Sequence, residues 1–184
     1  MSTPHPTALA EAASQLLEDL QALPPHALEQ QPLPDVALLA AIVHPRHCIA
    51  PTSVRRKLCE WIVVHQQRAL IAGDRAGYLQ WFTCDVLFED SSGPPCRGVT
   101  AVGNFIDRMM ASYETAKLDW YKLSSYPKYV DDADQWWRVR VAMTFQMEVT
   151  PIGGSPLKIE GVDVFDFDAS LRIERLTSFY PLST

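Results

Sequence analysis

The sequence contains no apolar run close to the roughly 20 residues that a helix needs to cross a membrane. Its first residues, 1–6, lack the charged start and apolar core of a secretory signal. The 16 Lys and Arg are outnumbered by 22 Asp and Glu, and they form no basic stripe that would suit nucleic acid. These absences argue against a membrane protein and a nucleic-acid-binding protein, and they predict a cytoplasmic location.

Closely spaced cysteines are also missing. The four cysteines are widely separated and form no C-x-x-C pair, which predicts free thiols, some of them buried. The segment 44–48 combines two histidines with a cysteine, but its proline and the lack of a second ligand pair favour a surface loop over a zinc site. We therefore expect no metal site.

Prolines divide the chain into two parts. Eight of the 14 prolines precede residue 52, and a helical pattern over 7–22 ends at a pair of them. We interpret residues 1–52 as a Pro-rich, partly helical N-terminal extension and residues 53–184 as the main domain. A main domain of this length can bury a core of moderate size.

The first half of the main domain has mostly helical periodicity. Ser53 is a plausible N-cap for a long helix that the Gly73-Asp74 pair ends. The expected elements after it are a short helix at 78–82, a strand at 86–90, a turn at 91–95 and a helix at 100–113.

The second half changes to a period of two. Apolar and polar residues alternate over 138–149, which predicts a strand with one buried face. A Gly- and Pro-rich hairpin connection follows, with further strands over 157–167 and 171–180. Helices followed by an antiparallel meander predict an α+β fold with the helices packed on one face of a curved sheet.

The order of these elements resembles the ketosteroid isomerase and SnoaL-like branch of the nuclear-transport-factor-2-like superfamily. The resemblance runs from about Ser53 to Tyr180. It rests on Gly73-Asp74, the Gly93-Pro94-Pro95 turn and the ending at 162–168, with Arg172-Ile173 and Phe179-Tyr180 after it. It implies a cone-shaped curved antiparallel sheet that encloses an apolar pocket against the helices, in a homodimer.

The resemblance also implies a function. The chain is expected to be an isomerase, cyclase or dehydratase that needs no cofactor and acts by enolate chemistry on a small hydrophobic carbonyl compound. A polyketide, a terpenoid or a steroid-like molecule would fit. The alternative is a non-catalytic module on the same fold, which binds a hydrophobic ligand or forms dimers.

Transfer of the family pattern places the catalytic roles on specific residues. The general base falls on Asp90, and the acid that stays protonated to hold an oxyanion falls on Glu160, a division of roles known from ketosteroid isomerase. Gln66 stands where the oxyanion tyrosine is expected, and an amide gives less to a developing oxyanion than a phenol does. Phe82 and Ile106 occupy the positions of two supporting tyrosines.

Each assignment has a structural alternative. Asp90 could cap its turn by accepting hydrogen bonds from the backbone. Glu160 shares its parity with Val162 and Val164, and it faces the cavity only if theirs is the concave face; otherwise it is a surface residue, since a slip of one residue turns every side chain to the other face. His65 is either a buried core histidine or a proton carrier in place of the missing tyrosine.

The pocket wall is expected to come from both the helices and the strands. An aromatic group could rim the ligand mouth or form a dimer face. Its members are Trp120, Tyr121, Tyr126, Tyr129, Trp136 and Trp137. The predicted pocket residues are Phe82, Phe88, Ile106, Trp120, Val141, Met143, Phe145, Met147, Val162, Ser178 and Tyr180.

Overall fold

The computed structural model describes residues 52–127 and 138–180, together with six helical positions between residues 11 and 22. The elements in chain order are α3 (Thr52–Ile71), α4 (Arg75–Leu79), β1 (Phe82–Asp90), β2 (Cys96–Arg97), α5 (Val99–Met110), β3 (Tyr113–Pro127), β4 (Val139–Pro151), β5 (Leu157–Phe167) and β6 (Ile173–Phe179). The histidine–cysteine segment at 44–48 lies outside the described residues, and so do Tyr129, Trp136 and Trp137 of the aromatic group.

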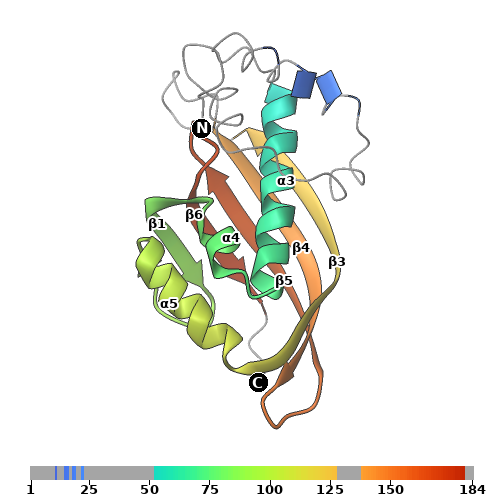
Figure 1. Ribbon diagram of the computed structural model, residues 1–184, viewed down its shortest axis with the longest axis vertical. Helices are drawn as coiled ribbons and strands as arrows, with labels where there is room; N and C mark the ends of the chain where they lie inside the picture. The colour runs from blue at the N-terminus through green and yellow to red at the C-terminus, as the bar shows by residue number, and fades with distance from the viewer. Residues whose placement is uncertain are drawn as a thin grey trace, which may run out of the picture.

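The strands form one curved sheet in the order β2-β1-β6-β5-β4-β3. Figure 1 shows α3 crossing the concave face of this sheet, with α5 packed beside β1. The sheet does not close, and β3 is an edge strand. The predicted α+β fold with a curved sheet packed against helices is therefore confirmed. The pairing of β1 with β6 is parallel, whereas the other neighbours in the sheet are antiparallel as a meander requires.

The Gly73-Asp74 pair explains how α3 ends and α4 begins. Gly73 has a φ of 70°, a left-handed conformation that glycine adopts without strain, and its amide bonds back to the Leu70 carbonyl at 3.1 Å. Asp74 then caps α4, because its Oδ1 accepts from the Gly77 amide at 2.9 Å. This cap starts the short helix earlier than the predicted range of 78–82, and Phe82 already belongs to β1.

Two further predictions about the elements need correction. The long helix begins by Thr52, so Ser53 is a helical residue and not the cap before the helix. The helix predicted over 100–113 ends at Met110 as α5, and the 15-residue strand β3 follows it. That strand was not expected from the sequence, because its polar and aromatic residues do not alternate cleanly.

The core lies between α3 and the concave face. The most deeply buried apolar residues come from α3, α4, β1, α5 and the three C-terminal strands, and include Leu58, Trp61, Ile62, Tyr78, Val86, Val102, Val141, Met143, Phe165 and Ile173. Leu16, one of the described residues of the N-terminal part, packs against this core. Contact between the two parts of the chain is thus seen, although their division at residue 52 stays a prediction.

Gly161 allows one large side chain to lie across the sheet. It pairs with Phe145 in the β4–β5 register, and a Cβ on Gly161 would lie 2.7 Å from Cζ of the Phe145 ring. Any side chain here would displace that ring or the Phe179 carbonyl oxygen, 2.9 Å away. Phe145 is thereby held over the concave face.

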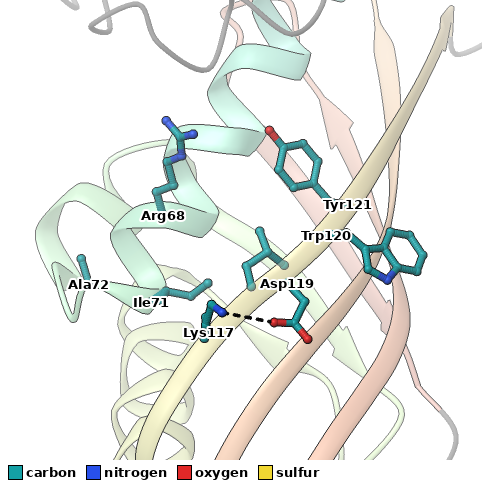
Figure 2. Close-up of a pocket in the computed structure, with 8 residues that line it drawn as sticks. Arg68, Ile71, Ala72, Lys117, Asp119, Trp120 and Tyr121 are labelled. Carbon is teal, nitrogen blue, oxygen red and sulfur yellow. Dashed lines mark ion pairs between the residues drawn. The ribbon is translucent and has the colours of Figure 1, made fainter.

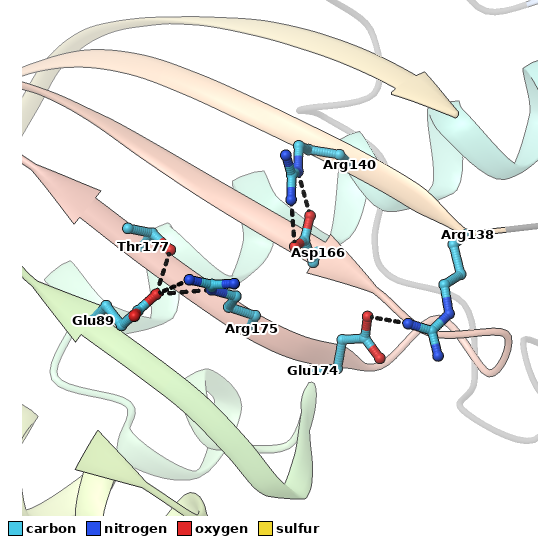
Figure 3. Close-up of polar contacts among 7 residues, drawn as sticks. All are labelled: Glu89, Arg138, Arg140, Asp166, Glu174, Arg175 and Thr177. Atoms are coloured by element: carbon cyan, nitrogen blue, oxygen red, sulfur yellow. Dashed lines mark hydrogen bonds and ion pairs between the residues drawn. The ribbon is translucent and has the colours of Figure 1, made fainter. Parts of the chain in front are cut away.

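The opposite face of the sheet carries paired charges. Arg140, Asp166, Arg175 and Glu89 form a row, called the outer row below, that crosses β4, β5, β6 and β1 on the face turned away from α3 (Figure 3). Arg140 Nη2 donates to Asp166 Oδ2 at 2.7 Å, and Arg175 Nε donates to Glu89 Oε2 at 2.8 Å. The hydrogen bond that Arg140 donates to Asp166 raises the pKa of Arg140, so its guanidinium remains charged.

Candidate active site

Three polar residues form a row on the concave face. Ser178 on β6 pairs with Asp163 on β5 and with Asp90 on β1, so the three side chains follow one another across adjacent strands. This set is called the inner row below. Asp163, Ser178 and Asp90 are 7%, 6% and 9% exposed. Two carboxylates thus lie in a largely apolar interior, about two strand spacings or roughly 10 Å apart along the sheet.

The inner row lines a small, partly open cavity of about 60 Å³. Its apolar walls include Leu70 and Ile71 from α3, Ile106 and Met109 from α5, and Phe145 and Met147 from β4. Of the described residues that line it, none is a lysine, arginine or histidine. The carboxylates of the inner row therefore line the cavity without a cation among the described lining residues.

Asp90 is held by donors on both of its oxygens. Oδ1 accepts from the Ser92 amide at 2.7 Å and from the Ser92 hydroxyl, and Oδ2 accepts from the Tyr180 hydroxyl. The cap that was the structural alternative for Asp90 is therefore present. Only Oδ1 accepts from the turn, whereas Oδ2 accepts from Tyr180, a residue that also lines the cavity. An ionised carboxylate can only accept, and this set of donors suits that form.

Asp163 has a different environment. Burial raises the pKa of its carboxyl to about 7, the nearby Ser178 hydroxyl opposes part of that rise, and the charge of Asp90 adds to it. Its Oδ2 accepts from Gln67 Nε2 at a long 3.5 Å, and its buried Oδ1 has no well-formed hydrogen bond to any described residue. Near neutral pH, Asp163 therefore exists partly as a neutral acid that can donate a hydrogen bond into the cavity.

Tyr78 brings a phenol to the same cavity from α4. Its side chain is 2% exposed and lines the cavity. Burial raises its pKa, and the charges of Asp163 and Asp90 raise it further, so the hydroxyl stays protonated. Gln66 donates to the Tyr78 carbonyl at 3.5 Å and so contacts α4 rather than the cavity.

The structure brings only some of the predicted site residues to this cavity. Those that line it are Asp90, Phe88, Ile106, Phe145, Met147, Ser178 and Tyr180. The core residues Phe82, Val141 and Met143 do not line it. Nor does Trp120, which is 45% exposed on the edge strand β3. His65 packs its ring against Trp61, with ring centroids 5.8 Å apart.

Glu160 and Val162 lie on the other face of the sheet. Glu160 is exposed and accepts from Gln146 Nε2 at 2.8 Å, so of the two orientations left open for β5 the one that makes Glu160 a surface residue is observed. The valines Val162 and Val164 suggested a buried face, but they are only half-buried. The residues that face the cavity side are those of odd number, including Asp163.

Asp163 could have been found from the hairpin. The predicted strands pair around Gly153-Gly154, and this register places Met143 opposite Asp163. Directly paired residues in antiparallel strands point to the same face, so the apolar face of β4 already indicated the inward residues of β5. No comparable signal marked Tyr78 or Gln67, because their positions depend on where α3 ends and how α4 packs.

A second hollow lies outside the cavity, between the end of α3 and β3. This outer groove has a volume of about 610 Å³ and is open to solvent. Figure 2 shows Arg68 and Ile71 on the helix side, with Lys117, Asp119 and Tyr121 on the strand side.

Among the described residues, no group of three or more His, Cys, Asp or Glu is arranged to hold a metal ion. No described helix is long and apolar enough to span a membrane.

Comparison with known proteins identifies the class. The family model of the SnoaL-like domain matches residues 63–176, well over half of the chain, and the protein belongs to this family of the nuclear-transport-factor-2-like superfamily. No curated protein matches the sequence.

Solved structures with the same fold include a candidate polyketide cyclase from Xanthomonas campestris pv. campestris. It is 23% identical, with a TM-score of 0.54 over 69% of this chain and 93% of that one. The orange carotenoid protein of Anabaena (Nostoc) binding canthaxanthin is 17% identical, with a TM-score of 0.53 over 66% of this chain and 36% of that one. A Mycobacterium tuberculosis protein in complex with estradiol-17β-hemisuccinate is 21% identical, with a TM-score of 0.50 over 66% and 92%.

Proposed function

We propose that the protein is a cofactor-independent enzyme that isomerises, cyclises or dehydrates a small hydrophobic carbonyl compound by acid–base chemistry. The observation that carries this proposal is the inner row. Two buried carboxylates share one apolar cavity: Asp90 accepts hydrogen bonds on both oxygens, whereas burial raises the pKa of Asp163. A site that holds one carboxylate as an acceptor and a second one as a neutral acid can supply both a base and an acid.

Asp90 is the base in this proposal. It removes a proton from the carbon next to the substrate carbonyl, and the electron pair moves onto the carbonyl oxygen to give an enolate. The proton is then returned to another carbon, or a hydroxyl group leaves as water. Ser92 and Tyr180 orient the carboxylate, and Oδ2 keeps further acceptor capacity beside the Tyr180 hydroxyl.

Asp163 and Tyr78 stabilise the enolate oxygen. Protonated Asp163 donates one hydrogen bond and the Tyr78 phenol donates a second, in a cavity with little water to weaken them. Tyr78 thus supplies the phenol that the family pattern places at the position of Gln66. Gln66 acts indirectly, as a positioning residue, through its hydrogen bond to the Tyr78 backbone.

The fold relatives support the class of substrate. One is a candidate polyketide cyclase, and others are solved with canthaxanthin or with an estradiol derivative. All of these names point to rigid hydrophobic molecules. A polyketide, terpenoid or steroid-like carbonyl compound accordingly remains the substrate class that we propose.

The test is a titration with phenols and naphthols of graded acidity, which mimic the enolate. We expect affinity to rise with acidity, to increase further in Asp90→Asn, which imitates the protonated base, and to fall in Asp163→Leu. Glu160→Gln is the matched control, because it removes an exposed carboxylate from the same strand. Binding that ignores both acidity and the inner row would end the enzyme proposal, and a loss in Glu160→Gln alone would return the acid to that residue.

One observation favours a second candidate, a non-catalytic binder of a hydrophobic carbonyl ligand. Both oxygens of Asp90 already accept hydrogen bonds, as expected of a residue that only holds its turn and the Tyr180 ring. For such a binder, Asp90→Asn would lower stability and leave the dependence on phenol acidity unchanged.

We also propose that the protein forms a homodimer. Trp120, Tyr126, Leu157 and Phe179 are large apolar residues between 44% and 55% exposed, and they lie on strands of the one sheet. Aromatic residues are enriched in interfaces. Light scattering on the purified full chain measures its mass, and a monomer at micromolar concentration would contradict this proposal.

A further inference from the structure

One aromatic ring forms the part of the cavity wall next to the inner row. Phe145 on β4 is 7% exposed and lines the cavity together with Asp163. It pairs with Gly161 on β5, and residues two apart on a strand point to the same face, so the ring lies beside Asp163 on the concave face. The ring occupies the space that a side chain at residue 161 would otherwise fill.

This ring has no room to move closer to the sheet. A Cβ at Gly161 would lie 2.7 Å from Cζ and 3.1 Å from Cε1 of Phe145, so the ring already lies against the backbone of β5. It can leave this position only by rotating away from the sheet, toward the side on which α3 crosses the concave face (Figure 1). Because Phe145 lines the cavity, such a rotation would fill it.

Other parts of the wall can yield more easily. Met109 on α5 and Met147 on β4 are only partly buried, and the unbranched side chain of methionine adapts to irregular gaps. Leu118 lies where the β3–β4 register shifts, on an edge strand with a neighbour on one side only. A ligand that enlarges the cavity therefore gains room beside these three residues and not across β5.

The volume of the cavity makes such an enlargement necessary. Cavities that bind small molecules measure roughly 300–1,000 Å³. The inner cavity measures about 60 Å³, so a ligand of the proposed kind must displace side chains of the wall. With the ring fixed beside Asp163, the space over the inner row grows in one direction, which limits the size of a rigid ligand.

We propose that Phe145, held against Gly161, determines ligand size: the site accepts compact carbonyl compounds of one or two fused rings and rejects rigid skeletons of three or four. This inference rests on the proposed function for the carbonyl end at the inner row, and it narrows the proposed substrate class to its compact members. Phe145 is a specificity-determining residue that contacts the ring system of the ligand and takes no part in proton transfer.

The experiment measures the affinity of the full-length protein for phenol, 2-naphthol, 2-phenanthrol and estradiol. These probes carry the hydroxyl that imitates the enolate on skeletons of one, two, three and four rings. In the unmodified protein, affinity should rise from phenol to 2-naphthol, because more apolar surface is buried, and then fall about tenfold or more at 2-phenanthrol and estradiol.

Phe145→Ala should reverse this order, so that the two larger probes bind about tenfold or more tightly than they bind the unmodified protein. Val141→Ala is the matched control. It shortens a buried side chain on the same strand and the same face, but Val141 does not line the cavity, so the order of the probes should stay unchanged. Thermal melts check that each variant is folded.

Gly161→Ala should act in the opposite direction. Its methyl group displaces the ring into the cavity, and 2-naphthol should bind about tenfold more weakly. Adding Phe145→Leu removes Cε1 and Cζ and should restore this binding. The close approach to the Phe179 carbonyl oxygen, 2.9 Å away, remains in the double variant, so restored binding assigns the effect to the ring. If Gly161→Ala does not fold, Phe145→Ala and its control decide alone.

The inference is overturned if the unmodified protein binds two-ring and four-ring probes equally, or if Phe145→Ala leaves their order unchanged. If that order is independent of Phe145 while the probes still respond to Asp90→Asn, the size selection is wrong and the proposed function stands. If the order depends on Phe145 while that response is absent, Phe145 sets the ligand size of a protein that is not the proposed enzyme. No binding of phenol or 2-naphthol to the unmodified protein would overturn both.

Discussion

The inner and outer rows both cross β5, β6 and β1 and both contain two carboxylates, yet those carboxylates have opposite surroundings. In the outer row, Asp166 and Glu89 each accept hydrogen bonds from an arginine. In the inner row, Asp90 and Asp163 have only neutral donors, from serine, tyrosine and glutamine side chains and one backbone amide. Asp166 and Asp163 lie on one strand and are both buried. Burial alone therefore does not determine whether a carboxylate stays charged. The group that donates hydrogen bonds to it decides that.

This difference separates stability from chemistry. A carboxylate paired with arginine is stabilised in its charged form and has little tendency to take up a proton. A buried carboxylate without a cationic partner is stabilised most by taking up a proton. We therefore expect substitutions in the outer row to change the free energy of unfolding, and substitutions in the inner row to change proton transfer and its pH dependence.

The largest effect is expected from Asp90→Asn. The rate of deuterium incorporation next to the carbonyl of 2-tetralone, followed by NMR in D₂O, should fall by about 10²–10⁴-fold, since the amide cannot act as the base. Glu89→Gln is the matched control on the same strand, because Glu89 faces the other side of the sheet. Equal rates in Asp90→Asn and the unmodified protein would contradict the assignment of the base.

The next effect concerns stability. Asp166→Asn removes the charge that pairs with Arg140, and the free energy of unfolding should fall by about 2 kcal/mol in urea titrations. The side chain of Arg140 is 33% exposed and can be hydrated, which keeps the loss below that of a fully buried pair. A loss as large in Asp163→Asn at pH 8 would remove the distinction between the two rows.

The pH dependence of stability isolates Asp163. Its folded-state pKa of about 7 lies above the ordinary value of 3.8, so the folded protein binds the proton more tightly than the unfolded chain does. This contribution to stability is fully present below pH 4 and is lost as the pH rises toward 7, on the order of 1 kcal/mol per pH unit. Asp163→Asn should flatten this decline in thermal melts between pH 5 and 8. A steeper decline in the variant would show that the sign is wrong.

The same group should limit activity at high pH. The exchange rate should fall as the pH rises through about 7, because ionised Asp163 no longer donates a hydrogen bond. In Asp163→Asn the amide donates at every pH, so the alkaline limb should disappear while a lower rate remains. An alkaline limb unchanged in that variant would assign it to another group.

The smallest effect is expected at the exposed end of the outer row. Glu89 and Arg175 are 31% and 46% exposed, so Glu89→Gln should cost only about 0.5 kcal/mol of unfolding free energy in urea, less in high salt. A loss above 2 kcal/mol would mean that the row acts as one network and not as separate pairs.

The sequence was sufficient for the features that depend on local pattern. Alternation predicted β4 and β5, and β5 was predicted at its observed bounds, because a two-residue period with a Gly-rich turn specifies a hairpin. The Gly73-Asp74 pair predicted a helix end, because each residue satisfies a backbone requirement within a few positions. The strand β3 was missed because no clean alternation marks an edge strand whose bulge shifts its register.

Which carboxylate lies in the cavity was decided by the tertiary structure. Asp90 was placed at the end of its strand from the sequence, but the partner acid was assigned to Glu160, three residues from Asp163 on the same strand. The sequence pattern could not show which face of β5 is buried, because valines occupy one face and phenylalanines the other. The pairing of β6 between β5 and β1, parallel to β1, joins Asp163, Ser178 and Asp90 in one row, and residues so far apart in the chain meet only through packing. Sequence alone thus determined the fold class and the position of Asp90 at the end of its strand, and the arrangement of distant strands decided which second carboxylate lines the cavity with it.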